Sequence, residues 1–119
     1  MSNTAWLAQL FRNIDARDTD AFVSYLTEDA LFQFGNAAPV RGKEAVRDAV
    51  AAFFSSIRSL SHAVHGSWAH PEAVVMHGEV TYTRHDGTRL TIPFANVLKM
   101  EGTSIQEYHV FTDLSELFR

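Results

Sequence analysis

The sequence has 119 residues, 46% of them hydrophobic and 12% aromatic, which fits one domain over residues 1–119 with a single hydrophobic core. The formal net charge of −4 and the lack of any basic run argue against nucleic-acid binding, and the absence of cysteine excludes disulfides and thiolate chemistry. The N-terminus does not read as a secretory signal, and no apolar run approaches the ~20 residues of a membrane span, so we expect a cytoplasmic protein without a membrane partner.

Three segments show the periodicity of amphipathic helices. The first covers residues 6–14. The second is short, covers residues 19–26 and would bury Phe22, Val23 and Leu26. A short strand is expected at residues 30–34. The third helix begins after Gly42 and carries a broad apolar stripe as far as Ile57.

Beyond the third helix the apolar period changes from helical to two, which indicates strands. Four segments rich in Val, Thr, Ile, Phe and Tyr are expected to be strands, at residues 61–69, 73–84, 88–100 and 104–113. The short turns "HDG" and "EGT" join the last three into a meander. Helices followed by a curled antiparallel sheet give an α+β fold class.

The turn "RHDGT" predicts the register of two central strands. A three-residue hairpin loop places Gly87 in the left-handed bulge position and pairs Arg84 with Thr88. Counting back along both strands places Gly78 opposite Phe94. Such a glycine leaves an empty side-chain volume, which suggests a pocket, although a glycine can equally mark a bend.

Asn96 is the one polar side chain on an otherwise apolar strand face. For the last turn we favour Met100 opposite Ser104, which places Phe94 beside Val110 and Asn96 beside Tyr108. A one-residue slip would place Asn96 beside Glu107 instead. An unpartnered buried amide costs roughly 1–3 kcal/mol. Asn96 therefore either bonds Tyr108 inside the core or turns toward a ligand carbonyl or hydroxyl.

The stretches "ARDTDAFVSYLTEDALFQF", "VRGKEAVRDAVAAFF", "YTRHDG" and "IQEYHVFTDL" resemble, in their order and spacing, the SnoaL-like branch of the nuclear-transport-factor-like superfamily. The resemblance covers nearly the whole chain. It implies a cone in which three N-terminal helices pack on a strongly bent, mainly antiparallel sheet, and a homodimer formed through the outer sheet face. The superfamily includes ketosteroid isomerases, epoxide hydrolases, polyketide cyclases and proteins that only bind or assemble, so the fold leaves the function open.

This chain has other residues at the positions that the resemblance aligns with the catalytic residues of these relatives. Ketosteroid isomerases, similar through "TEDALFQF", have a base, a protonated Asp and a Tyr where this chain has Phe34, Ala95 and Leu10 or Phe11. Limonene-type epoxide hydrolases, similar through "EGTSIQEYHVFTDL", have a Tyr and an Asn on the first strand and an Asp on the last. Phe32, Phe34 and Val110 occupy those positions, so whether the chain is an enzyme stays open.

His62 and Asp113 are the candidate catalytic residues. His62 begins a strand on which Val64, Gly66 and Trp68 are expected to share its side, and a histidine can act as acid or base near neutrality. It can equally be a packed core residue. Asp113 is the carboxylate late in the last strand that the polyketide cyclases imply, but it can also cap the closing turn.

We therefore expect an apolar pocket for a small hydrophobic molecule, with proton transfer, isomerisation or hydration as the reaction. The alternative is a non-catalytic ligand-binding or dimeric assembly module. No cofactor is implied, and the histidine spacing predicts no metal site. A cavity open to Asn96 would favour the enzyme, and a packed core with Asn96 bonded to Tyr108 the module. The expected ligand-binding residues are Asn96, Tyr108, Gly78, Phe94, Val110, Tyr82, Phe32, Phe34, Tyr25 and Trp68.

Overall fold

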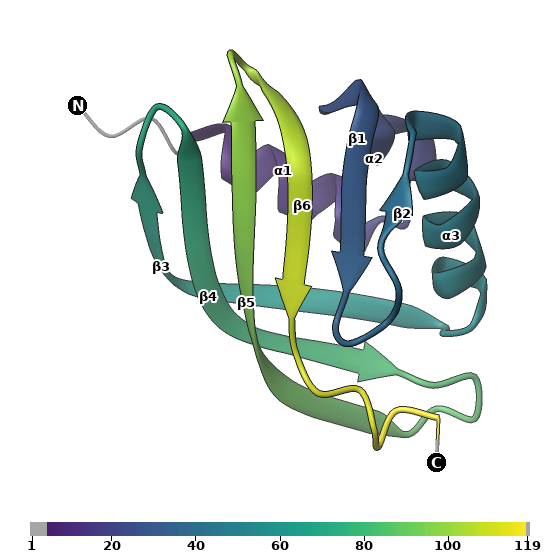
Figure 1. The fold of residues 1–119 in the computed structure, drawn as a ribbon. Helices are drawn as coiled ribbons and strands as arrows, with labels where there is room; N and C mark the ends of the chain where they lie inside the picture. The colour runs from purple at the N-terminus through teal and green to yellow at the C-terminus, as the bar shows by residue number, and fades with distance from the viewer. Residues whose placement is uncertain (1–4, 119) are drawn as a thin grey trace.

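The computed structural model describes residues 5–118, in which three helices cover one face of a six-stranded sheet (Figure 1). The helices are α1 (Ala5–Asp15), α2 (Thr19–Val23) and α3 (Lys43–Ser55). The strands are β1 (Leu26–Phe34), β2 (Val40–Arg41), β3 (Ser59–Ala69), β4 (Ala73–Thr83), β5 (Arg89–Glu101) and β6 (Ser104–Phe111). The α+β class is confirmed.

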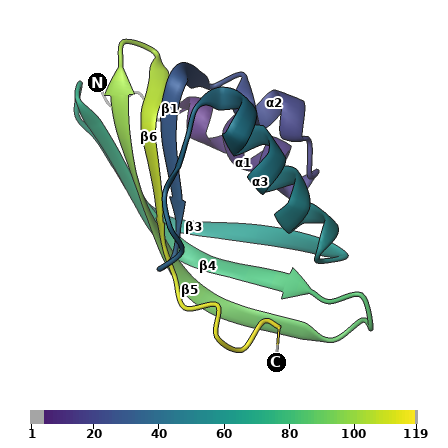
Figure 2. The same cartoon turned by 45° about the vertical axis from the view of Figure 1, so that its right-hand side comes forward.

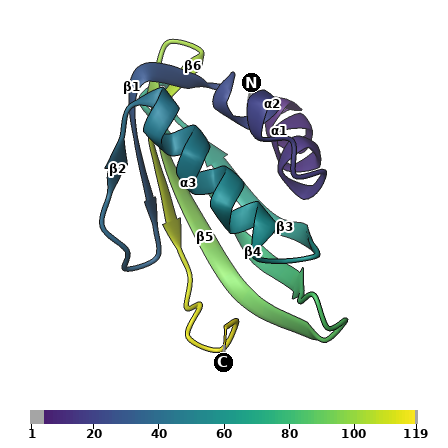
Figure 3. The ribbon, with the colours of Figure 1, turned by 90° about the vertical axis from the view of Figure 1, so that its right-hand side faces the viewer.

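The sheet has the order β2-β1-β6-β5-β4-β3, and its neighbouring strands are antiparallel except for the parallel pair β1 and β6. The long strands β3, β4 and β5 bend strongly, so that one part of the sheet turns beneath the helices (Figures 2 and 3). This confirms the predicted cone. The three helices are not contiguous, however, because β1 and β2 come before α3.

The second helix is shorter than predicted. It ends at Val23, and Leu26 is buried as the first residue of β1 rather than the last of the helix. The Asp18 carboxylate accepts a hydrogen bond from the Ala21 N–H at 3.0 Å and so caps α2. This short helix brings Phe22 over the inner face of the sheet, where its ring lies 5.2 Å from that of Tyr108.

The predicted register of β4 and β5 is confirmed. Gly87 has φ +89°, and the Arg84 N–H donates to the Thr88 carbonyl at 2.8 Å. Gly78 lies opposite Phe94, as the count along the strands requires.

The predicted register of β5 and β6 is wrong by two residues. Glu101 pairs with Ser104 around a two-residue turn, and a bulge follows because Gln106 has no partner between the paired residues on either side. As a result Asn96 pairs with Val110, not with Tyr108. A shift of two preserves the face of each side chain, so Tyr108 still points into the cone beside Asn96.

Gly78 marks a bend and not a hole. A Cβ built at Gly78 would lie 1.9 Å from the carbonyl oxygen of Ala63, because β3 comes very close there at a bulge between Val64 and Gly66. The bulge also reverses the sides of the residues that follow it. Trp68 therefore pairs with Val75 on the outer face and is 60% exposed, which contradicts the predicted placement on the side of His62.

Candidate functional site

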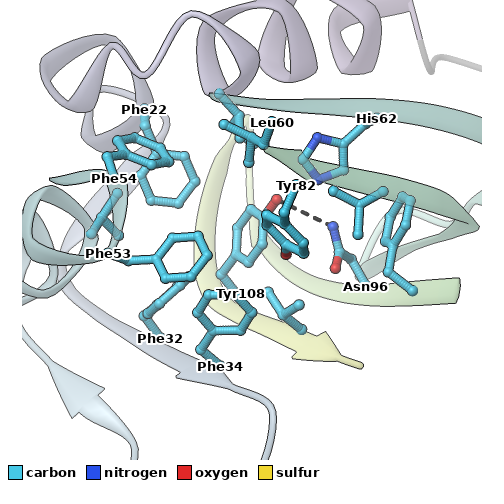
Figure 4. Close-up of a pocket in the computed structure, with 15 residues that line it drawn as sticks. Phe22, Phe32, Phe34, Phe53, Phe54, Leu60, His62, Tyr82, Asn96 and Tyr108 are labelled. Atoms are coloured by element: carbon cyan, nitrogen blue, oxygen red, sulfur yellow. Dashed lines mark hydrogen bonds between the residues drawn. The ribbon is translucent and has the colours of Figure 1, made fainter. Parts of the chain in front are cut away.

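A cavity of about 60 Å³ lies inside the cone, between the helices and the bent sheet (Figure 4). Eight of the residues expected from the sequence line it: Asn96, Tyr108, Phe94, Val110, Tyr82, Phe32, Phe34 and His62. Most of the remaining wall is apolar and comes from α1, α2 and α3 and from the first residues of β3. Four polar side chains, one on each of four neighbouring strands, thus line an otherwise apolar cavity.

Asn96 forms the predicted hydrogen bond with Tyr108 and also keeps one polar atom available to a ligand. Its side chain is 2% exposed, and its Nδ2 donates a hydrogen bond to the Tyr108 hydroxyl at 3.2 Å. The pair is diagonal across β5 and β6, since Asn96 is directly opposite Val110. Its Oδ1 has no hydrogen-bond partner within residues 5–118. A buried, unpartnered acceptor beside a cavity is the arrangement expected where a bound molecule supplies the donor.

His62 is paired with a carboxylate that the sequence did not single out. Its Nδ1 lies 2.6 Å from Asp15 Oδ1, and its backbone N–H donates to Asp15 Oδ2 at 3.0 Å. The side chain of His62 is 10% exposed and that of Asp15 27%. Both carboxylate oxygens therefore bind one residue and fix the orientation of its ring. Nε2 is the ring nitrogen left for the cavity (Figure 4).

Asp15 was missed because it contacts His62 across 47 residues of sequence. A weak signal existed, since Asp15 lies one helical turn after Phe11, and Phe11 belongs to the apolar stripe of α1. The Phe11 and His62 rings lie 4.8 Å apart, so the residue one turn further along α1 also reaches β3. Sequence periodicity placed Asp15 beside the buried face of the helix but did not reveal its partner.

Tyr82 and Tyr108 are held in their protonated form. Burial raises the pKa of each hydroxyl above its usual range, and the negative charge of Asp15 raises both pKa values further because it opposes a phenolate. Each hydroxyl therefore serves as a hydrogen-bond donor or acceptor near neutral pH and not as a base.

Half-buried aromatic rings form one side of the cavity. The Phe34 and Phe53 rings are 4.7 Å apart, and the Phe53 and Tyr82 rings are 5.7 Å apart. Drug-sized ligands occupy pockets of about 300–1,000 Å³. A cavity of about 60 Å³ holds only a few atoms without movement of its walls. A drug-sized ligand would therefore require the cavity walls to move.

Four expected residues lie away from this cavity. Gly78 adjoins the bulge and Trp68 lies on the outer face, where it stacks on His77. Tyr25 lines a separate hollow with Trp6, and its hydroxyl accepts a hydrogen bond from Asn13 at 3.2 Å.

Asp113 caps the turn after β6, since its Oδ1 accepts from the Ser115 N–H at 2.9 Å. Among residues 5–118, no group of three or more His, Asp or Glu side chains is placed to hold a metal ion. No helix in the same part of the chain is long and apolar enough to cross a membrane.

The sequence matches the family model of the SnoaL-like domain over residues 7–108. None of the curated proteins matches the sequence. An NTF2-like protein of unknown function from Burkholderia pseudomallei K96243 has a TM-score of 0.87 at 18% identity, with 100% of this chain and 97% of that chain covered.

Two further solved structures similar to this chain carry names that describe an activity. A protein proposed to be a SnoaL-like polyketide cyclase, from Jannaschia sp. CCS1, has a TM-score of 0.81 at 19% identity, with 94% of this chain and 85% of that chain covered. An LEH-like epoxide hydrolase from Mycobacterium tuberculosis has a TM-score of 0.78 at 13% identity, with coverages of 94% and 83%. At these identities the likeness extends to the fold alone.

Proposed function

Since the chain belongs to the SnoaL-like domain family, we propose that its cavity binds a compact, mostly hydrophobic molecule and that the His62–Asp15 pair transfers a proton during its isomerisation or hydration. One observation carries the proposal: a carboxylate-oriented histidine and an unpartnered Asn96 Oδ1 face the same cavity. The solved structures named as a cyclase and an epoxide hydrolase are consistent with chemistry on small molecules in this fold.

The roles follow from the hydrogen bonds. A carboxylate only accepts, so in the neutral imidazole the proton sits on Nδ1 of His62, facing Asp15, and Nε2 presents a lone pair to the cavity. Asp15 is a positioning residue that also stabilises the imidazolium once His62 has taken a proton. The neutral hydroxyls of Tyr82 and Tyr108 can donate to an oxygen on which negative charge develops.

The proposal is tested by following compact ketones, enones and epoxides by NMR in deuterated water. Wild type should accelerate either exchange of a ketone α-proton or conversion of an enone or epoxide. His62→Gln should remove the acceleration, because glutamine has no titrating nitrogen. The control is His65→Gln, which changes an exposed histidine of the same strand. Equal rates for wild type and His62→Gln would refute the catalytic role.

The non-catalytic alternative makes a different prediction. A binding module should take up the same compounds, detected as a shift of the Asn96 side-chain amide resonance, in wild type and in His62→Gln alike. It should release each compound chemically unchanged.

We also propose a homodimer formed through the outer sheet face. One row across four strands runs through Trp68, Val75, Val97 and His109, and Phe111 lies in the neighbouring row. Trp68 is 60% and Phe111 56% exposed. A half-apolar sheet face of this kind is typical of an interface between copies. Sedimentation equilibrium should give a dimer for wild type and a monomer for Val97→Arg, and a wild-type monomer would refute the proposal.

A further inference from the structure

The polar side of the cavity presents two acceptors and two donors. Asn96 Oδ1 has no partner within residues 5–118, and in the same part of the chain His62 Nε2 makes no hydrogen bond. The Tyr108 hydroxyl accepts from Asn96 but donates to no described residue, and the Tyr82 hydroxyl forms no hydrogen bond with residues 5–118. Figure 4 shows both hydroxyls and the His62 ring gathered around the Asn96 amide.

This set of groups is complementary to a water molecule. Water donates two hydrogen bonds and accepts two, and a buried water needs two to four polar partners. The cavity measures about 60 Å³, and on such a measure roughly 10–15 Å³ is enough to hold one water molecule. One water can therefore occupy the polar side while space for a few atoms remains beside the aromatic rings. A ligand carbonyl, by contrast, would leave Asn96 Oδ1 without a donor.

We propose that the cavity holds a water molecule which donates to Asn96 Oδ1 and His62 Nε2 and accepts from the tyrosine hydroxyls, and that this water is the group His62 deprotonates. The inference rests on the proposed function and narrows it to the addition of water. The ligand class is a compact electrophile whose attacked carbon releases an electron pair to oxygen, a property that epoxides and enones share.

The step balances without a further reactant. As Nε2 of His62 takes one water proton, the water oxygen forms a bond to the electrophilic carbon. The displaced electron pair moves to the ligand oxygen, directly from the broken C–O bond of an epoxide or through the conjugated π system of an enone. Tyr82 moves its hydroxyl hydrogen bond from the water to that oxygen, which frees the water lone pair that forms the new bond, and His62 returns its proton to the ligand. The net change is the addition of one water, and nothing is oxidised or reduced.

Two measurements test this inference. A crystal structure that resolves ordered water should show density within hydrogen-bonding distance of both Asn96 Oδ1 and His62 Nε2. In solution, wild type should hydrate 1,2-epoxybutane or 3-penten-2-one. Asn96→Leu and Asp15→Asn should each lower kcat at least tenfold. Asp15→Asn should leave KM unchanged, because within residues 5–118 the Asp15 carboxylate hydrogen-bonds only to His62 and does not line the cavity. Asp48→Asn, which removes the same charge from an exposed site on α3, is the matched control.

The outcomes separate the two proposals. Exchange of ketone α-protons without hydration would leave the proposed function standing and overturn the water inference. A cavity without density at Asn96 and His62 would overturn it as well, whatever the kinetics. Absence of binding, exchange and hydration would refute the proposed function. A water seen between Asn96 and His62 would in that case be a structural water, and its role in hydration would be refuted.

Discussion

Replacing Asn96 with leucine should stabilise the protein while abolishing ligand chemistry. Asn96 is 2% exposed and leaves Oδ1 without a partner within residues 5–118. The proposed water is the partner of Oδ1 in the ligand-free protein, and immobilising that water costs up to about 2 kcal/mol, so the amide lowers the stability of this state. Leucine has the same branching with two methyl groups in place of the amide atoms, and the adjacent cavity can accept the added volume.

The magnitude follows from two opposing terms. Removing a buried acceptor that only an immobilised water satisfies is worth up to about 2 kcal/mol. Losing the hydrogen bond from Nδ2 to the Tyr108 hydroxyl costs about 0.5–1.5 kcal/mol. The net expectation is a gain of about 1 kcal/mol in the free energy of unfolding. For a chain of this length that is an increase in Tm of roughly 4 °C.

Urea denaturation monitored by tryptophan fluorescence measures this change. The companion variant Tyr108→Phe should move the other way, by about 1–2 kcal/mol, since it leaves Nδ2 of the Asn96 amide without its partner. In the Asn96→Leu background the same Tyr108→Phe change should be nearly neutral. If Asn96→Leu instead destabilises the protein by more than about 1 kcal/mol, the amide is a satisfied part of the core and the ligand-anchor reasoning is refuted.

Gly78→Ala should destabilise the protein by about 3 kcal/mol or more, because the new Cβ would overlap the Ala63 carbonyl. Gly66→Ala should lower the melting temperature less, because its Cβ meets mainly the tip of the Trp68 side chain. Equal melting temperatures for the two variants would refute the bend at Gly78. Tyr82 and Tyr108 have raised pKa values in the folded state, so their contribution to stability is complete below about pH 10 and is lost as the pH rises above it. Phenolate absorbance should therefore show both tyrosines ionising only as the protein unfolds, and their ionisation in the folded protein would contradict the assigned burial.

The fold was predictable because its signals are local. The apolar stripe of α3 and the "RHDGT" turn each specify one element, and the turn fixed the β4–β5 register correctly. The errors come from two bulges, at Gln106 and between Val64 and Gly66, which the alternation of side chains does not encode. The β5–β6 turn, one residue shorter than predicted, and the first bulge each shift the register by one residue, so together they leave Tyr108 and Val110 on the predicted face. The second bulge shifted the β3–β4 register by an odd number and turned Trp68 outward.

The cavity wall was predictable for the same reason, since residues on the inner faces of β4, β5 and β6 follow from alternation alone. The His62–Asp15 pair was not, because it depends on the crossing of α1 over β3, which is a property of packing. The sequence left open whether Gly78 marks a pocket or a bend. The 1.9 Å between a Cβ built at Gly78 and the carbonyl oxygen of Ala63 decides for the bend. Single-residue signals thus located the site, while tertiary contacts determined its chemistry.

Three of the positions where the resemblance places catalytic residues of known enzymes hold Phe32, Phe34 and Val110, and these three residues line the cavity. Their size is one reason that the cavity is small, and their apolar character leaves only Asn96, His62 and the two tyrosines as its polar groups. The aromatic substitutions and the carboxylate supplied from α1 are therefore two parts of one arrangement. The carboxylate that orients His62 comes from the helix side, whereas His62 itself and the other hydrogen-bonding groups come from the sheet.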